Sequence, residues 1–267
     1  MRRLAVVLAA AVAAGCTPAL REPPSIATLA SKPSPVAFPD SSSLLHEADL
    51  RWARRPDVAA VAAAESLYLR AAQLDEKDVL GLIGATRTKA WLTDHEREYR
   101  RRVDLAVSAV QTAQWCKRRD PALAACDYWL AVAVGLQARE LRVTADDGLK
   151  TMVPALQRAI DTDPGYDNAG PHRVMAIVLV RAPGWPVGPG DVEAGLGHAK
   201  QAVALRPDYP PNVFALAEAL AANKDREGAR EAYMQGKALA AVSRDAMDPD
   251  APFWIVEADE ALAKLRP

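Results

Sequence analysis

The chain has 267 residues, half of them hydrophobic, and its 33 basic and 34 acidic residues give a formal net charge of −1. This length suits one medium domain or a short array of helical repeats. The balanced charge excludes attraction of nucleic acid by bulk charge.

The N-terminus has the form of a secretory signal peptide. Arg2 and Arg3 precede an apolar run over residues 4–12 that is too short to span a membrane. The following Ala13-Ala14-Gly15-Cys16 resembles the bacterial lipobox, whose cysteine becomes the lipidated N-terminus. We therefore expect a signal peptide over residues 1–15 and a lipid anchor on Cys16. Because Thr17 rather than Asp follows, we expect the periplasmic side of the outer membrane. The alternative is a simple secretory signal in which Cys16 is incidental.

A proline-rich stretch separates this start from the body of the chain. Six prolines fall between Thr17 and Asp40, among small and polar residues. Such a composition predicts a disordered, partly polyproline tether over residues 16–42. The folded domain is then expected over residues 43–267.

The body begins with helical patterns. Apolar residues recur at helical spacing over residues 44–55, and Pro56 suits the first turn of a second helix. That second helix carries Ala64, Tyr68 and Ala71, a small, an aromatic and a small residue at offsets of four and three. This pattern is typical of a helix that packs closely against a partner helix.

Four more helices are predicted in the middle of the chain, over residues 79–92, 96–119, 126–141 and 149–168. The pairs Thr93–Glu96 and Thr144–Asp147 have the spacing of capping boxes at helix starts. The arginines between residues 97 and 102 form either a ligand or membrane patch or a solvated helix face. In the last of these helices, Ala159 and Pro164 stand five residues apart.

The stretch from Asp191 to Ala241 predicts three helices with small residues at fixed offsets. One set is Gly195, Ala199, Ala202 and Pro207, and the set 34 residues later is Ala229, Tyr233, Gly236 and Ala241, with Leu216 and Ala217 on the intervening helix. The pattern resembles the tetratricopeptide repeat (TPR), in which small residues let paired helices approach. We expect an all-α, TPR-like solenoid of about four helix hairpins with a C-terminal capping helix. A loop rich in proline and glycine, residues 182–190, interrupts the period.

The sequence offers little for catalysis. None of the four histidines has a second ligand at zinc-type spacing, and no nucleotide-binding or nucleophile motif occurs. We therefore predict no catalytic residues, no metal site and no cofactor. Clustered histidines and carboxylates in a closed pocket would revive an enzymatic hypothesis.

Two cysteines and a few aromatic residues remain. Cys116 and Cys126 stand ten residues apart across a turn, so they form either a disulfide or two buried free thiols. Trp129 lies either in the core or in a ligand groove. Trp185, on the loop of residues 182–190, is a candidate contact residue.

Residues 123–141 and 170–216 resemble a narrower family, the T-component lipoproteins of tripartite ATP-independent periplasmic (TRAP) transporters. The shared features are Tyr128-Trp129, Gly170-Pro171-His172-Arg173, Ala182-Pro183, Gly190-Asp191 and Pro207-Asp208-Tyr209. The chain departs from the family in His172 and in its longer, Trp-bearing loop.

The resemblance implies binding to a periplasmic solute-binding protein and to a small, apolar organic ligand. The candidate contact residues are Tyr128, Trp129, His172, Arg173, Met175 and Trp185. An apolar channel lined by Trp129 and Met175 would favour this transport role. The alternative is a general scaffold lipoprotein of the envelope, which binds other envelope proteins and no ligand, and which a polar concave face would favour.

Overall fold

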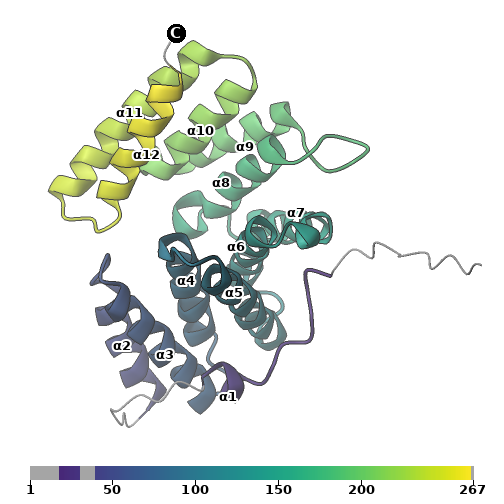
Figure 1. The fold of residues 1–267 in the computed structure, drawn as a ribbon, viewed down its shortest axis with the longest axis vertical. Helices are drawn as coiled ribbons and strands as arrows, with labels where there is room; N and C mark the ends of the chain where they lie inside the picture. The colour runs from purple at the N-terminus through teal and green to yellow at the C-terminus, as the bar shows by residue number, and fades with distance from the viewer. Residues whose placement is uncertain (1–17, 31–39, 266–267) are drawn as a thin grey trace, which may run out of the picture.

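The computed structural model describes residues 18–30 and 40–265, and within these ranges it contains helices and no strand. The helices are α1 Ile26–Leu29, α2 Ser41–Trp52, α3 Val58–Leu74, α4 Leu80–His95, α5 Tyr99–Arg119, α6 Ala124–Glu140, the 3-10 helix η1 Arg142–Thr144, α7 Ala145–Thr162, α8 Tyr166–Arg181, α9 Val192–Leu205, α10 Pro210–Ala222, α11 Arg226–Asp245 and α12 Ala251–Lys264. The predicted all-α fold is confirmed (Figure 1).

Consecutive helices pack as hairpins. Over residues 40–265 there are five of them, α2–α3, α4–α5, α6–α7, α8–α9 and α10–α11, and α12 covers α11 as the predicted cap. The first helix of each hairpin also contacts the first helix of the next, which makes the array a solenoid. This is one hairpin more than the expected four, and both helices of α4–α5 agree with predicted helices, over residues 79–92 and 96–119. The second helix of this hairpin carries Ala106, Val110 and Ala113 at the same offsets of four and three, and all are buried.

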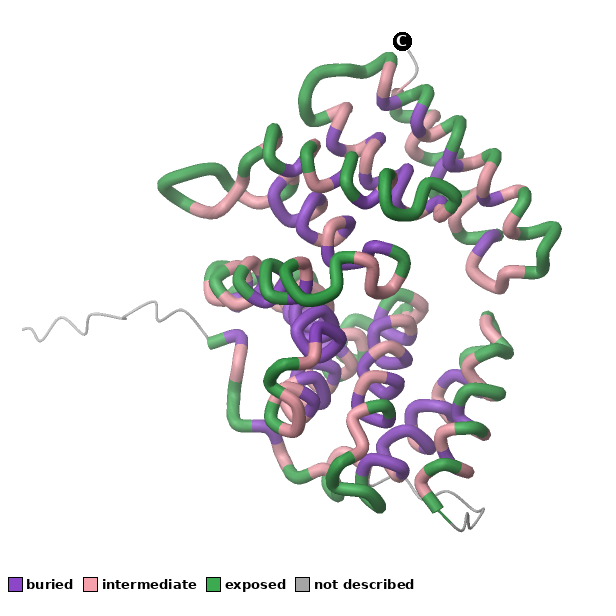
Figure 2. The backbone as a smooth tube through the Cα atoms, turned by 180° about the vertical axis from the view of Figure 1, so that it is seen from behind, coloured by how far each residue is buried: buried purple, intermediate pink, exposed green. Residues whose placement is uncertain are grey.

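Buried residues follow the contact faces of the hairpins (Figure 2). The cluster with the most buried residues lies among α5, α6, α7 and α8 and includes Trp129 and Met175. No helix in the described ranges is long and apolar enough to cross a membrane.

Small residues stand where the C-terminal helices touch. Ala199, Ala202 and Ala229 have no exposed surface, in keeping with the close approach of paired helices. A Cβ built on Gly195 would lie 2.8 Å from Val180 Cγ2 on α8, and one built on Gly236 would overlap the Phe214 ring on α10. These contacts leave no room for a side chain, so glycine sets the distance between the helices.

The other predicted packing residues also lie at helix contacts or helix ends. Ala64, Tyr68, Ala71, Ala159 and Ala217 are buried, and Leu216 and Tyr233 are half-buried against hydrophobic clusters. The remaining two, Pro164 and Pro207, are exposed and follow the ends of α7 and α9. Proline there prevents continuation of the helix.

The segment before the body is packed against it. Ala19 is 1% exposed and its N–H donates to Asp147 Oδ2 at 2.7 Å. Further along, Trp115 Nε1 donates to the Pro24 carbonyl at 2.8 Å, and α1 contacts α3 and α5. The prediction of a free, disordered tether is therefore wrong for residues 18–30, because helices of the body satisfy the backbone groups of this proline-rich segment. The predicted signal peptide and Cys16 lie outside the described residues.

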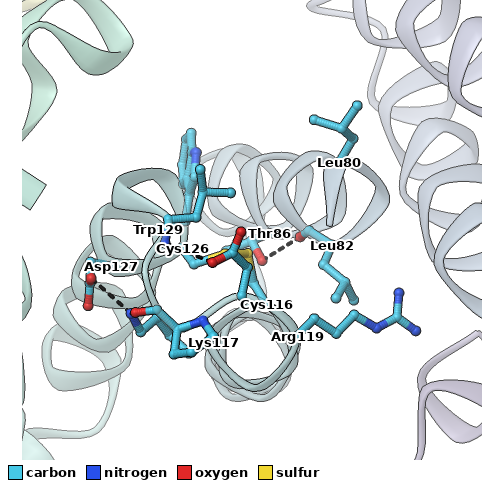
Figure 3. The surroundings of a disulfide bond; sticks show 12 residues. Leu80, Leu82, Thr86, Cys116, Lys117, Arg119, Cys126, Asp127 and Trp129 are labelled. Carbon is cyan, nitrogen blue, oxygen red and sulfur yellow. Dashed lines mark hydrogen bonds and ion pairs between the residues drawn. A yellow bond between two sulfur atoms is a disulfide. The ribbon is translucent and has the colours of Figure 1, made fainter. Parts of the chain in front are cut away.

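A disulfide joins the end of α5 to the start of α6. Cys116 and Cys126 have Cα atoms 5.4 Å apart and both side chains are buried (Figure 3). Beside it, Lys117 Nζ donates to Asp127 Oδ2 at 2.8 Å. The neighbouring Arg119 donates to the carbonyl oxygens of Ala72 and Asp75, at 2.7 and 2.9 Å. This part of the solenoid is thus held by a covalent bond and by an arginine that caps the end of α3.

Candidate functional site

The start of α8 contains a left-handed turn. Asp167, Asn168 and Ala169 have φ values of 48°, 55° and 61°, a conformation that non-glycine residues rarely adopt. Arg173, one turn further on, donates to the Asp167 carbonyl at 3.3 Å and to the Asn168 carbonyl at 3.1 Å. A buried guanidinium therefore holds the turn in place by hydrogen bonds to its backbone.

The same arginine joins the first helices of three hairpins. Arg173 donates to Tyr128 on α6 at 3.2 Å, to the Asp167 carboxylate at 3.1 Å and to Asn212 Oδ1 on α10 at 3.0 Å. The Tyr128 hydroxyl donates to Asp167 Oδ2 at 2.6 Å. Burial raises the pKa of Tyr128 well above its usual value, and the Asp167 charge adds to this. Because Tyr128 stays protonated, it remains a donor at neutral pH.

Arg173 and Tyr128 thus connect the third, fourth and fifth hairpins. We call this cluster of Tyr128, Asp167, Arg173, Tyr209 and Asn212 the arginine joint. The Arg173 guanidinium lies 5.2 Å from the Tyr209 ring centroid. Burial raises the pKa of Tyr209 to about 12. The motif that suggested contact with a ligand is therefore built into the packing between hairpins.

Trp129 and Met175 are core residues. Trp129 is 8% exposed, its indole N–H donates to the Tyr166 hydroxyl at 3.0 Å, and Met175 is 2% exposed. Neither side chain is among those that line the apolar groove of α6, α7 and α8 described below. Of the two alternatives for Trp129, the core position is the one observed.

An apolar groove lies next to the arginine joint. It is formed by α6, α7 and α8 and has a volume of about 490 Å³. Its main apolar lining residues are Val132, Leu136, Leu149, Met152, Val174 and Ile177. Arg139 and Arg181 stand at its rim beside Ala182 and Pro183. Apolar walls with a few charged groups are typical of sites for small organic molecules.

The loop after α8 presents Trp185 to solvent. Its side chain is 90% exposed, the largest such value among the described large hydrophobic residues. The ends of the loop are tied by a bridge between Gly184 and Gly190, where a Cβ on Gly190 would overlap the Ala182 carbonyl oxygen. Glycine is required there because two backbone segments touch. The loop therefore holds an exposed tryptophan on a closed base, next to the groove.

The two ends of the solenoid meet across a half-exposed cluster. At the N-terminal end, Trp52 has the guanidinium of Arg55 at 3.8 Å and that of Arg87 at 4.6 Å from its ring centroid. Arg55 Nε donates to Asp250 Oδ1, just before α12, at 3.1 Å. We call the surface formed by Trp52, Arg55, Arg87, Trp91, His95, Tyr209, Phe253 and Trp254 the aromatic–arginine face.

Stacked rings continue this face on both sides of the meeting point. His95 stacks on Trp91 with ring centroids 3.6 Å apart and meets Phe253 of α12 edge-on at 4.8 Å. On the other side, Tyr209 meets Trp254 edge-on at 5.5 Å. No pattern in the sequence indicates this cluster, because its members come from elements that are far apart in the chain. The contact between His95 of α4 and Phe253 of α12 could not be found from periodicity.

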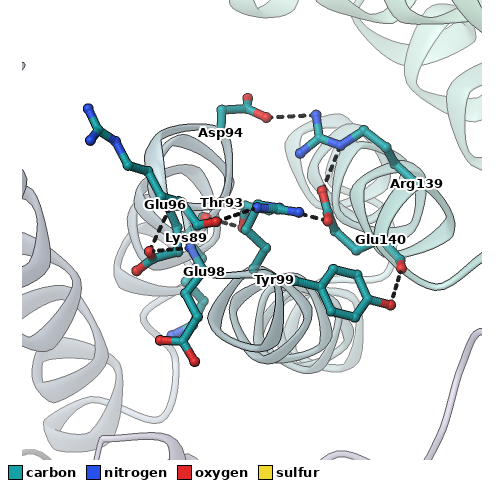
Figure 4. Close-up of polar contacts among 10 residues, drawn as sticks. Lys89, Thr93, Asp94, Glu96, Glu98, Tyr99, Arg139 and Glu140 are labelled. Carbon is teal, nitrogen blue, oxygen red and sulfur yellow. Dashed lines mark hydrogen bonds and ion pairs between the residues drawn. The ribbon is translucent and has the colours of Figure 1, made fainter.

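Polar contacts fix the helices that carry this face. Lys89 and Glu65 form a buried ion pair between α4 and α3. Arg139 on α6 reaches Asp94 on α4 at 2.7 Å (Figure 4), and Glu140 accepts from Arg102 on α5 at 2.9 Å. Burial opposes the charge on Glu140, but the two arginines outweigh it and lower its pKa. These pairs keep the end of α4, with Trp91 and His95, in register with α6.

His172 lies away from the groove and meets His198 of α9. Their Nδ1 atoms are 3.0 Å apart. Sequence spacing could not reveal this pair, because the two residues are 26 positions apart on different helices. No group of three or more histidine, cysteine or acidic residues suited to a metal occurs in the described ranges. The absence of catalytic residues stays a prediction.

No known family profile matches the sequence, and no curated protein matches it. Among solved structures, the chain is similar to TTC0263, a thermophilic TPR protein of Thermus thermophilus, with a TM-score of 0.61 and 20% identity. The match covers 84% of this chain and 99% of that one. A MamA RS-1 double mutant gives a TM-score of 0.48 at 18% identity over 79% of this chain and 99% of that one. The fold of this chain is therefore that of a TPR-type α-solenoid.

Proposed function

We propose that this protein is a non-catalytic TPR-type accessory protein of the bacterial envelope, the T-component of a TRAP transporter. In this role it is lipid-anchored through Cys16 on the periplasmic side of the outer membrane. It binds a periplasmic solute-binding protein, and its apolar groove receives a small apolar organic ligand.

The observation that carries this proposal is the apolar groove beside the arginine joint. The joint contains Tyr128 and Arg173, two residues of the motif shared with the T-components. Val132 and Leu136, one and two turns after Tyr128 on α6, line the groove. The motif thus fixes the geometry of the helices that form a site for an apolar molecule.

The aromatic–arginine face is the surface best suited to the protein partner. Its members are half-buried or exposed, with Phe253 41% exposed. Aromatic residues and arginine are enriched at protein interfaces and at their energetic centres. With Arg55 and Arg87 beside Trp52, this face fits a partner segment that carries aromatic and acidic side chains.

Capture from envelope extracts tests the partner. The wild-type protein should retain a solute-binding protein, and Arg87→Glu should lose it, because the charge on the aromatic–arginine face is reversed. Arg100→Glu is the matched control, since Arg100 is an exposed arginine of α5 that is not a member of this face. Capture of other envelope proteins without any transport component would contradict the transport role.

Mass spectrometry of organic extracts tests the ligand. Protein purified from its native envelope should release an apolar molecule, and Leu149→Trp should release much less, because the larger ring fills the groove. Leu205→Trp is the control, since Leu205 lies exposed at the end of α9 and outside the groove. Equal release by both variants would place the molecule elsewhere.

The burial of Trp129 and Met175 favours a second candidate function. With these residues in the core, a general scaffold of the envelope needs the aromatic–arginine face and no ligand. The two experiments separate the candidates, because a scaffold retains protein partners but releases no molecule from the groove.

A further inference from the structure

We propose that His172 and His198 form a two-histidine site for a divalent transition-metal ion, with Cu²⁺ as the favoured ion. His172 projects from α8 and His198 from α9, and their Nδ1 atoms lie 3.0 Å apart. Both side chains are partly exposed, so an ion can reach them from solvent. The site bridges the two helices of the fourth hairpin.

The protonation state of the pair suits a metal. Burial lowers the pKa of both imidazoles, and for His172 the neighbouring His198 lowers it further. Metal binding requires the neutral ring, whose unprotonated nitrogen carries the lone pair. In the metal-free pair, one Nδ1–H donates to the other Nδ1. When a metal ion binds both Nδ1 atoms, the ring that carried its proton on Nδ1 gives that proton to water and takes one up on Nε2, so both rings stay neutral and no net proton is released.

The short distance between the nitrogens favours a narrow nitrogen–metal–nitrogen angle. With metal–nitrogen bonds of about 2.05 Å, nitrogens 3.0 Å apart meet at the metal at an angle of about 94°. This angle corresponds to neighbouring positions of a tetragonal site, which Cu²⁺ and Ni²⁺ prefer, rather than to the wider angle of tetrahedral Zn²⁺. Cu²⁺ also binds nitrogen ligands more tightly than the other common divalent ions.

The site is open on its solvent side. No third metal-binding side chain joins the pair among the residues that the structure covers. The remaining positions are therefore filled by water or by a donor from a bound partner. Because both histidines bind the same ion, replacing either one removes the additional affinity that a second ligand provides.

Titration of tag-free protein with CuCl₂ tests the proposal. Calorimetry should show one site, and the electron paramagnetic resonance spectrum should show coupling to two imidazole nitrogens. His172→Gln and His198→Gln should each weaken binding about tenfold or more. His46→Gln is the control, since His46 is exposed on α2 and has no histidine neighbour. Circular dichroism of the metal-free variants confirms that they are folded.

Thermal unfolding gives a second measure. Cu²⁺ should raise the midpoint of the wild type and of His46→Gln, and not that of either variant of the pair, because an ion that binds only the folded state stabilises it. Unchanged affinity in His172→Gln and His198→Gln, or a spectrum with no nitrogen coupling, would overturn the proposal.

Discussion

The C-terminal hairpins, α8–α9 and α10–α11, and the N-terminal ones, α2 to α7, are held together by different means. The C-terminal pair keeps a 34-residue period, and its helices touch through small residues such as Ala199, Ala202 and Gly236. The N-terminal hairpins add a disulfide, a buried ion pair and the packed segment 18–30. The regular repeat relies mainly on close packing of small residues, whereas the helices that depart from it add covalent and buried ionic bonds.

The arginine joint stands between these two regions. There the chain adopts a left-handed turn of three non-glycine residues, which costs free energy at each position. The hydrogen bonds of Arg173 to the turn and to Asn212 offset that cost. Arg173 makes most of the side-chain hydrogen bonds to the turn, and Tyr128 and Asn212 add one each to Asp167 and to the Asn168 carbonyl.

The largest effect is expected from Arg173→Met. In this variant the Asp167 carboxylate, the Asn168 carbonyl and Asn212 each lose the hydrogen bond that Arg173 donates. Breaking a buried ion pair costs about 3–5 kcal/mol. Urea unfolding followed by circular dichroism measures the loss.

Arg181→Met is the matched control for this change. Arg181 makes two hydrogen bonds to Glu218, but its side chain is 64% exposed, so about 0–1 kcal/mol is expected. Equal losses for the two variants would mean that the joint is no stronger than a surface ion pair.

The disulfide of the N-terminal region comes next. Cys126→Ser should lower the free energy of unfolding by roughly 3 kcal/mol, since closing the ten-residue separation restricts the unfolded chain. The same loss should appear when the wild type unfolds in a reducing agent, and the reducing agent should not affect Cys126→Ser. An effect of the reducing agent on the variant would show that another change is responsible.

The sequence predicted the fold where one periodic signal controls it. Ala202 and Ala229 are fully buried, and the reason is visible in the sequence, because a helix contact requires a small residue at a fixed offset. The same spacing of small residues occurs on α5, at Ala106 and Ala113. Five residues after Ala113 the chain has Arg118 instead of the usual proline, so the match to the repeat is incomplete there.

Contacts between distant side chains could not be predicted in this way. Thr93 was expected to cap α5, but it lies inside α4 and its hydroxyl donates to the Lys89 carbonyl at 2.8 Å. Asp147 was expected to complete a capping box, but it accepts from Ala19. The groove and the aromatic–arginine face likewise depend on which helices meet in space.

Two glycines test how far shape alone closes the C-terminal hairpins. Gly236→Ala places a Cβ against the Phe214 ring of α10, and overpacking of this kind costs about 1–3 kcal/mol. Gly197→Ala is the control, because nothing lies within 4 Å of its Cβ, and alanine in place of a helical glycine should stabilise by about 1 kcal/mol. Thermal unfolding should therefore shift in opposite directions for the two variants. A shift in the same direction would show that the contact with Phe214 does not limit the packing.

The smallest effect concerns the histidine pair, which links α8 and α9 of the fourth hairpin. Burial lowers the pKa of His172 and His198 below the ordinary value of 6.5, so that the unfolded chain takes up protons first as the pH falls. The folded state should therefore lose stability as the pH falls from above 6.5 towards the lowered pKa values. In metal-free buffer, His172→Gln and His198→Gln should flatten the pH dependence of the unfolding free energy in this range, and His46→Gln should not. A slope that stays the same in all three variants would assign the loss to other groups, and the fourth hairpin would then be closed by Gly195, Ala199 and Ala202 without a contribution from the pair.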